Sequence, residues 1–275
     1  MSNATPSPRR SRVRSATAGI AVPTLALPTL LALASPLTAC RTAPHPATRP
    51  EPVRTPSQPE PAGWITLAEG LRINRATHTV EFDANVAMDC HNPATPDVYL
   101  ELIACTPDSR EHESLVVTDV PPSLIHAALL AIGAEPGAPA DLATSTPPSG
   151  DAVTVAFTES NTATPATIQI NNWITDAPTR TRRPDLRFVF AGSRDARPNA
   201  PIAYDADGTG VIVGLATFGS EVIANADLIN PSADIDEPIW IADPRAVPKF
   251  NTSVRVRLTT SLTPNNAKND AKNDE

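Results

Sequence analysis

Glycine and aromatic residues are scarce in this chain of 275 residues, whereas proline is abundant. There are 11 glycines and 31 prolines, and no phenylalanine, tryptophan or tyrosine occurs before Trp64. A packed core depends on large apolar side chains, and aromatic ones contribute much of its buried area. We therefore expect the folded part to begin near residue 63, which leaves about 200 residues, enough for one sizeable core.

The sequence also lacks the short motifs that mark common catalytic and metal sites. It contains no Gly-x-Ser-x-Gly, His-Glu-x-x-His or Cys-x-x-Cys pattern and no glycine-rich phosphate loop. The segment from Tyr204 to Val211 has alternating aspartates but lacks the later glutamate of a calcium loop, so we interpret it as a hairpin turn. The sequence therefore gives no basis for assigning a reaction, and we expect a non-catalytic role.

Negative charge dominates once the start of the chain is set aside. The formal net charge is −8, but four arginines lie within the first 14 residues, before any acidic residue. From Cys40 onward the chain holds 18 basic and 30 acidic side chains, a net charge of −12. Because binding to a phosphate backbone needs clustered lysine and arginine side chains, we expect no nucleic-acid partner.

Residues 1–39 have the pattern of a bacterial lipoprotein signal peptide. A basic start is followed by an apolar run and then by Leu-Thr-Ala-Cys, which ends at Cys40 and resembles the lipobox. This resemblance implies lipid attachment to the Cys40 sulfur and cleavage just before it. A transmembrane helix is the alternative, but Pro23 and Pro28 interrupt the run, and a span needs roughly 20 apolar residues. We therefore expect an exported protein, lipid-anchored in the cell envelope, facing the periplasm or in the outer membrane.

The rest of the chain divides into three parts. Residues 40–62 begin with the lipidated cysteine and continue as a linker whose seven prolines favour an extended polyproline II conformation. Residues 63–262 are the expected globular domain. Residues 263–275 repeat a polar unit that cannot bury enough apolar surface to fold, so we expect a disordered tail.

Within the domain, short runs of alternating apolar and polar residues are typical of half-buried strands. One main helix is expected over about 122–132, with prolines in its first turn and Gly133 as its cap. These patterns predict an α+β domain, a mostly antiparallel β-sheet with one main α-helix packed on it. The strands are predicted near 64–67, 78–86, 98–105, 112–118, 151–158, 166–171, 187–191, 211–218 and 253–260.

Two further predictions concern local structure, a hairpin and a second helix. Strands 98–105 and 112–118 are joined by Thr-Pro-Asp-Ser-Arg, which contains residues favoured in turns, so we expect them to form a hairpin. A second, shorter helix is expected near 221–229.

The segment "LELIACTPDSREHESLVVTDVPPSLIHAALLAIGAEPGAPA" resembles the YdjY-domain family of bacterial secreted and lipid-anchored proteins. The segments "RFVFAGS" and "YDADGTGVIVGLATF" are also similar to this family, so the resemblance runs from about 65 to 262. It implies a domain of the cell envelope without an established biochemical activity. The matching positions in the first segment are Cys105, Pro107, Glu111, His112, Glu113 and 126–130.

Two cysteines, Cys90 and Cys105, remain if Cys40 carries a lipid. Exported proteins meet an oxidising compartment, where two such cysteines usually pair. The resulting loop of about 15 residues would contribute roughly 3 kcal/mol. Pairing requires the loop between them to fold back along the strand. A disulfide, two free buried thiols and thiolate ligation of a metal all stay open.

A metal site is the second chemical hypothesis. Cys105 and His112 lie near one end of the predicted hairpin, and His126 on the next helix is able to pack back on the sheet. With a carboxylate from Glu111 or Glu113, these side chains would suit zinc or copper. Strand alternation, however, places the two glutamates on the face opposite His112, as expected for a solvated strand edge.

The sequence thus favours a lipid-anchored cell-envelope domain that acts as a non-catalytic binding or structural module without a cofactor. The alternative is a metal-binding or redox-active envelope protein that uses Cys105, His112 and His126. The membrane is the expected partner through the lipid anchor at Cys40. The sequence does not identify a protein or small-molecule partner.

Overall fold

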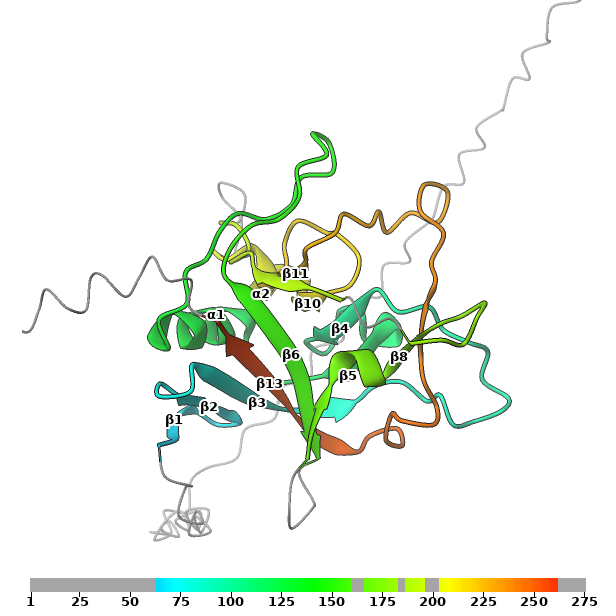
Figure 1. Ribbon diagram of the computed structural model, residues 1–275, viewed down its shortest axis with the longest axis horizontal. Coiled ribbons are helices and arrows are strands. Elements are labelled where there is room, and N and C mark those ends of the chain that lie inside the picture. Colours follow the sequence, from blue (N-terminus) through cyan, green and yellow to red (C-terminus); the bar gives the residue numbers. More distant parts are fainter. Residues whose placement is uncertain (1–62, 160–165, 183–185, 196–202, 262–275) are drawn as a thin grey trace, which may run out of the picture. The chain divides into compact units, whose positions relative to one another are not determined.

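The computed structural model describes residues 63–159, 166–182, 186–195 and 203–261 (Figure 1). The predicted signal peptide, Cys40, the proline-rich linker and the polar tail lie outside these residues. No helix in these ranges is long and apolar enough to cross a membrane.

Eight strands of one sheet close into a barrel. Each strand pairs with its neighbours around the ring, and the ring closes where the last strand of the series pairs with the first. Most of the pairings are antiparallel, but β4 with β5 and β10 with β11 are parallel. In order around the ring the strands are β3 (Thr79–Val86), β13 (Ser253–Thr260), β6 (Ala152–Glu159), β9 (Phe188–Phe190), β11 (Ile223–Asn225), β10 (Val211–Gly214), β4 (Leu102–Cys105) and β5 (Ser114–Val117).

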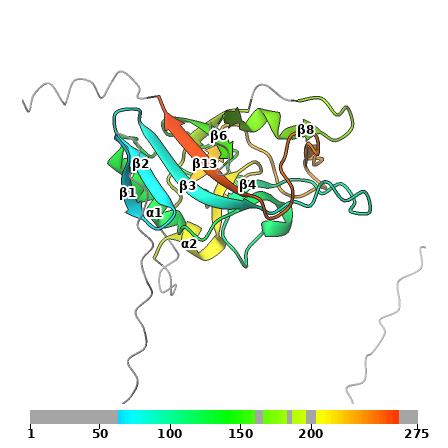
Figure 2. The same ribbon diagram turned by 90° about the horizontal axis from the view of Figure 1, so that it is seen from below.

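The closure depends on β3 having a partner along each of its two edges. Seven residues of β3 pair with β13, and its last two residues, Asn85 and Val86, pair with Val117 and Val116 of β5. Figure 2 shows β13 between β3 and β6. Because β3 has a partner along both edges, the sheet has no free edge at this point.

Smaller elements extend the sheet. β1 (Ile65–Ala68) and β2 (Leu71–Asn74) continue it outward from β3, and β7 (Thr167–Gln169) pairs with β6. A separate ribbon joins β8 (Ile174–Asp176) to β12 (Trp240–Ala242). The ribbon is tied to the segment before β4 because the Leu100 N–H donates to the Trp240 carbonyl at 2.8 Å.

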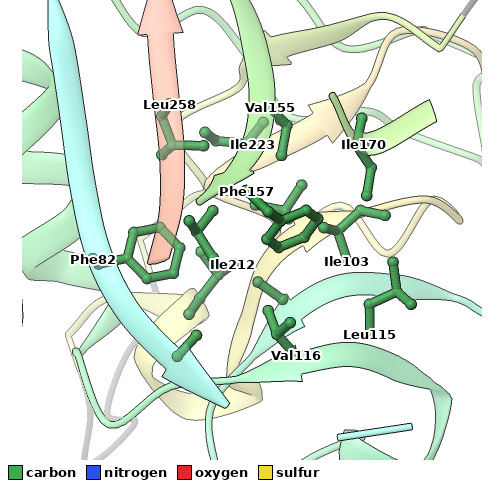
Figure 3. Close-up of a cluster of buried hydrophobic side chains, with 14 of the residues drawn as sticks. Phe82, Ile103, Leu115, Val116, Val155, Phe157, Ile170, Ile212, Ile223 and Leu258 are labelled. Atoms are coloured by element: carbon green, nitrogen blue, oxygen red, sulfur yellow. The ribbon is translucent and has the colours of Figure 1, made fainter. Parts of the chain in front are cut away.

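The long strands follow the alternation of their sequence. In β13, Val254, Val256 and Leu258 are buried, whereas Arg255 and Arg257 lie on the other face, as predicted. Side chains from strands all around the ring meet in one core, part of which is shown in Figure 3. Among them Phe157 stacks on Trp173 with 4.0 Å between the ring centroids. Burial of such rings is a major stabilising contribution.

The main helix, α1 (Pro122–Ala131), forms where the sequence predicts it. Pro122 occupies its first turn, where a missing N–H costs nothing. Gly133 ends the helix with a φ of +90°, and the Ala134 N–H donates to the Leu129 carbonyl. The buried face includes Ile125 and Leu129, and α1 packs on β2 and β3.

The predicted architecture, an α+β sheet with the main helix packed on it, is wrong. The domain is mostly β, and its sheet closes on itself. The closing contact joins residues 85–86 to 116–117. Alternation along a strand shows which face is buried, but it does not show which strand becomes its neighbour.

The two predicted hairpins and the second helix are also wrong. β4 and β5 are parallel neighbours, so the chain between them crosses over through the short turn η1 (Glu111–Glu113). The segment after Tyr204 forms the helix α2 (Asp205–Thr209), closed by Gly210 with a φ of +74°. The region predicted as a helix near 221–229 contains β11, which is buried between β9 and β10.

Candidate binding site

The crossover between β4 and β5 carries the Glu-His-Glu element. Its turn is fixed locally, because the Ser109 hydroxyl donates to the Thr106 carbonyl at 2.6 Å and the Ser109 N–H donates to Glu111 Oε2 at 3.0 Å. Backbone N–H groups of the turn hold the pKa of the Glu111 carboxyl below its usual range. Glu111 therefore stabilises the turn through its ionised carboxylate.

Arg110 joins two acidic residues at the surface. Its Nη1 atom lies 2.7 Å from Glu101 Oε2 and 3.3 Å from Glu113 Oε2, and its guanidinium covers the Phe218 ring at 4.6 Å. Burial, together with the neighbouring Glu113 carboxyl, raises the pKa of Glu101 to about 7. Close to neutral pH, the Glu101 carboxyl is thus able to hold a proton.

The backbone of Glu101 is fixed by three parts of the chain. Its N–H donates to the Glu113 carbonyl at 3.0 Å, and its own carbonyl accepts the N–H groups of Leu215 and Ala216 at 2.9 Å each. The preceding residue, Leu100, is tied to Trp240. Glu101 therefore lies at the junction of the Glu-His-Glu turn, the loop after β10 and the ribbon strand β12.

A cavity of about 300 Å³ opens at this junction, and we call it the Glu101 pocket. Its wall is partly apolar and partly acidic, a combination that suits small-molecule recognition. The loop that forms much of the wall is ordered by its own contacts, since the Asn230 N–H donates to Asp236 Oδ2 at 2.6 Å. The Glu101 pocket is lined by Leu100, Glu101, Ala216, 227–231 and 236–240.

Four carboxylates line the Glu101 pocket, and no lysine or arginine does. Two of them have a positive partner outside the lining: Arg110 binds Glu101, and Arg187 Nη2 lies 2.8 Å from Asp227 Oδ1. Within the part of the chain that the structure describes, Asp236 and Glu237 take part in no ion pair. The pocket therefore has a net negative charge.

His126 lies in a different place, on α1. Its Nδ1 atom is 2.9 Å from the Tyr204 hydroxyl oxygen, and that hydroxyl donates to the Gly192 carbonyl at 2.9 Å. The imidazole also meets the Phe190 ring edge-to-face, with 5.0 Å between centroids. Burial lowers the pKa of His126, so the neutral ring is favoured. These contacts of His126 and Tyr204 pack the three segments that resemble the family against one another.

The metal ligands suggested by the sequence do not converge. His112 is exposed on 73% of its side chain, with its Nε2 atom 3.8 Å from Glu113 Oε1, whereas Cys105 is buried beside Leu102 and Val211. Among the described residues, no group of three or more histidine, cysteine or acidic side chains is arranged to hold a metal ion. The structure therefore offers no site in which Cys105, His112, His126 and Glu113 act together.

Cys90 and Cys105 are both free, so the disulfide that the sequence suggested is not formed. Cys105 is held inside the sheet because its neighbours across β4 are Val211 and Val117. Cys90 lies beyond the end of β3, half-buried, with its sulfur 3.9 Å from His91 Nδ1. Burial raises the pKa of both thiols, which keeps them protonated.

Sequence reasoning missed most of the Glu101 pocket. Its main wall comes from 227–240, where two prolines and four acidic residues surround short apolar steps. The mixture of acidic and apolar residues before Trp240 was the one feature of the sequence that could have indicated a binding site in this segment. Only the fold shows that this segment faces Glu101, which is more than 100 positions away along the chain.

The fold and the pocket together define a class: a mostly β domain with a closed eight-stranded sheet and an acidic pocket beside it. The family model described as the YdjY domain matches residues 71–259, and the chain belongs to this family. No curated protein and no solved structure matches the chain.

Proposed function

We propose that this protein is an exported lipoprotein whose YdjY domain serves the cell envelope as a non-catalytic binding module. The lipid anchor is supported by the sequence, in which a basic start and an apolar run lead to Leu-Thr-Ala-Cys at Cys40. The two acyl chains of a diacylglyceryl group on Cys40 would hold the domain at a membrane, because each buried CH₂ contributes about 0.8 kcal/mol.

The observation that carries the binding role is the Glu101 pocket. It is preformed, because backbone hydrogen bonds from Glu113, Leu215 and Ala216 fix the residue at its edge. Preformed concave sites with a few polar groups are the usual setting of small-molecule binding. Because the loops of such a site are already ordered, ligand binding does not carry the entropic cost of ordering them.

A binding role without catalysis is supported by the state of the nucleophilic side chains. Cys105 is a buried thiol, and its raised pKa disfavours the reactive thiolate. The Ser193 hydroxyl is buried and donates to the Ser220 carbonyl at 2.7 Å, so it is engaged in holding the loop. Neither group presents an activated nucleophile to a substrate.

The anchor is tested by replacing Cys40 with serine in the full-length chain and fractionating the producing cells. We expect the wild type in the membrane fraction and Cys40→Ser in the soluble fraction, because the acyl chains are then absent. Cys90→Ser is the matched control and should leave the distribution unchanged. Membrane association that survives Cys40→Ser would refute the anchor.

The binding role is tested by identifying small molecules that copurify with the full-length chain. Ile229→Trp fills the Glu101 pocket, whereas Ile235→Trp changes an exposed residue of the same segment that does not line it. We expect a compound that is released unchanged from the wild type and from Ile235→Trp but is lost from Ile229→Trp. A compound retained by Ile229→Trp, or recovered in chemically altered form, would contradict the proposal.

A further inference from the structure

We infer that the Glu101 pocket takes a small organic cation, with a positively charged ammonium group at Asp236 and Glu237 and a short apolar body against Leu100 and Ile239. This inference rests on the proposed binding role and adds the chemical class of the ligand. It follows from the charge, the apolar lining and the size of the pocket.

Charge is the first argument. Four carboxylates line the pocket without any basic residue, and Arg110 and Arg187 offset only Glu101 and Asp227. Asp236 and Glu237 follow each other directly in sequence and both line the cavity. An anion entering this site would meet uncompensated like charge, whereas a cation would be attracted.

The apolar lining excludes a ligand that is charged throughout. Leu100, Ile229 and Ile239 contribute aliphatic side chains, and a fully hydrated metal ion or a polyamine would leave this surface without a partner. Burying the apolar part of a ligand there gains about 25 cal/mol per Å². The combination of apolar wall and acidic rim therefore matches a molecule with one cationic head and one apolar body.

Size sets the upper limit. The cavity of about 300 Å³ is at the small end of the range for ligand pockets. It accommodates a short alkyl chain or a single ring together with a head group. The occupant is thus a small amphiphilic cation, and a folded protein domain would not enter.

The first test titrates the purified full-length chain with hexyltrimethylammonium. Hexanoate and hexanol are the matched probes with negative and no charge. We expect saturable binding of the cation by calorimetry, with hexanoate weaker by about tenfold or more because its charge is repelled. Amide resonances of 227–230, 236–237 and 239–240 should shift during the titration. Equal binding of all three probes, or no binding of the cation, would overturn the inference.

The second test reverses one charge. Glu237→Lys should weaken binding of hexyltrimethylammonium by about tenfold, whereas Glu135→Lys, an exposed acidic residue outside the pocket, should leave it unchanged. Equal melting temperatures show that both variants are folded, and unchanged affinity in Glu237→Lys would overturn the assignment.

Failure of this inference is distinguishable from failure of the proposed function. If Ile229→Trp loses a copurifying compound that is neutral or anionic, the pocket binds but its ligand class is wrong. If no compound depends on Ile229, the binding role itself fails.

Discussion

The Nδ1 atom of His126 lies 2.9 Å from the Tyr204 hydroxyl oxygen, and this contact joins α1 to the segment that begins α2. The same two helices are joined again where the Ser123 N–H donates to Asp207 Oδ1 at 2.8 Å, which satisfies one of the free N–H groups at the start of α1. The histidine and tyrosine of the family-like segments thus hold α1 and α2 together, although the two helices are far apart in the sequence.

Removing the tyrosine hydroxyl should loosen this contact. Tyr204→Phe leaves His126 and the Gly192 carbonyl without their shared partner, and we expect a loss of about 1–2 kcal/mol in the free energy of unfolding. Urea denaturation measures the change. The control is Tyr99→Phe, which alters an exposed ring and should change stability by less than about 0.5 kcal/mol. Equal stability of both variants would contradict a structural role for the His126–Tyr204 pair.

Glu101 should make stability depend on pH. Its pKa is about 7 in the folded protein against 4.5 for the free side chain, so the folded state binds the extra proton. Its stabilising contribution is therefore complete below pH 4.5 and is lost as pH rises towards and through 7. We expect the loss to be of order 1 kcal/mol, because solvent screens this partly exposed group.

The measurement compares the free energy of unfolding of the wild type and Glu101→Gln from pH 4 to pH 8. The difference between them isolates Glu101 from His126, whose lowered pKa acts in the opposite direction and costs stability as pH falls below 6.5. Glu135→Gln is the control and should reproduce the wild-type profile. A constant difference between wild type and Glu101→Gln at all pH values would show that Glu101 does not titrate as stated.

Glu81 should be among the most costly polar side chains to remove. Its carboxylate is fully buried and receives Arg72 Nε at 2.8 Å and Arg257 Nε at 2.6 Å. Arg255 Nη1 also lies 3.9 Å from Glu81 Oε2, so Glu81→Ala leaves three arginines close together without this acid, and we expect a loss of about 3 kcal/mol. Asp83→Ala, on the same strand but exposed and paired with Arg255, should cost less than about 1 kcal/mol. Thermal and urea unfolding would reveal the contrast, and equal losses would refute it.

The two cysteines should differ in reactivity. Iodoacetamide should modify Cys90 at least about tenfold faster than Cys105 in the native protein, because Cys105 is fully buried and Cys90 is not. Peptide mass spectrometry gives the two rates, and denaturation should make them similar. Recovery of the Cys90 and Cys105 peptides joined by a disulfide would contradict the free thiols.

Local features of the fold follow from the sequence. The alternation in β13 places its valines inside, and the prolines and Gly133 set the ends of α1, because turns, caps and strand faces depend on neighbouring residues. The family resemblance also follows from short segments, and the family model confirms it over residues 71–259. The export signal and the anchor at Cys40 stay predictions.

Only the tertiary structure decided how these parts meet. Closure of the sheet through β3 and β5, the parallel pairing of β4 with β5 and the separation of Cys90 from Cys105 all depend on contacts between distant segments. The Glu101 pocket likewise needs the 227–240 segment to face the Glu-His-Glu turn. Strand periodicity identifies a buried face but carries no record of which other strand covers it, so these relationships emerge only when the whole chain packs.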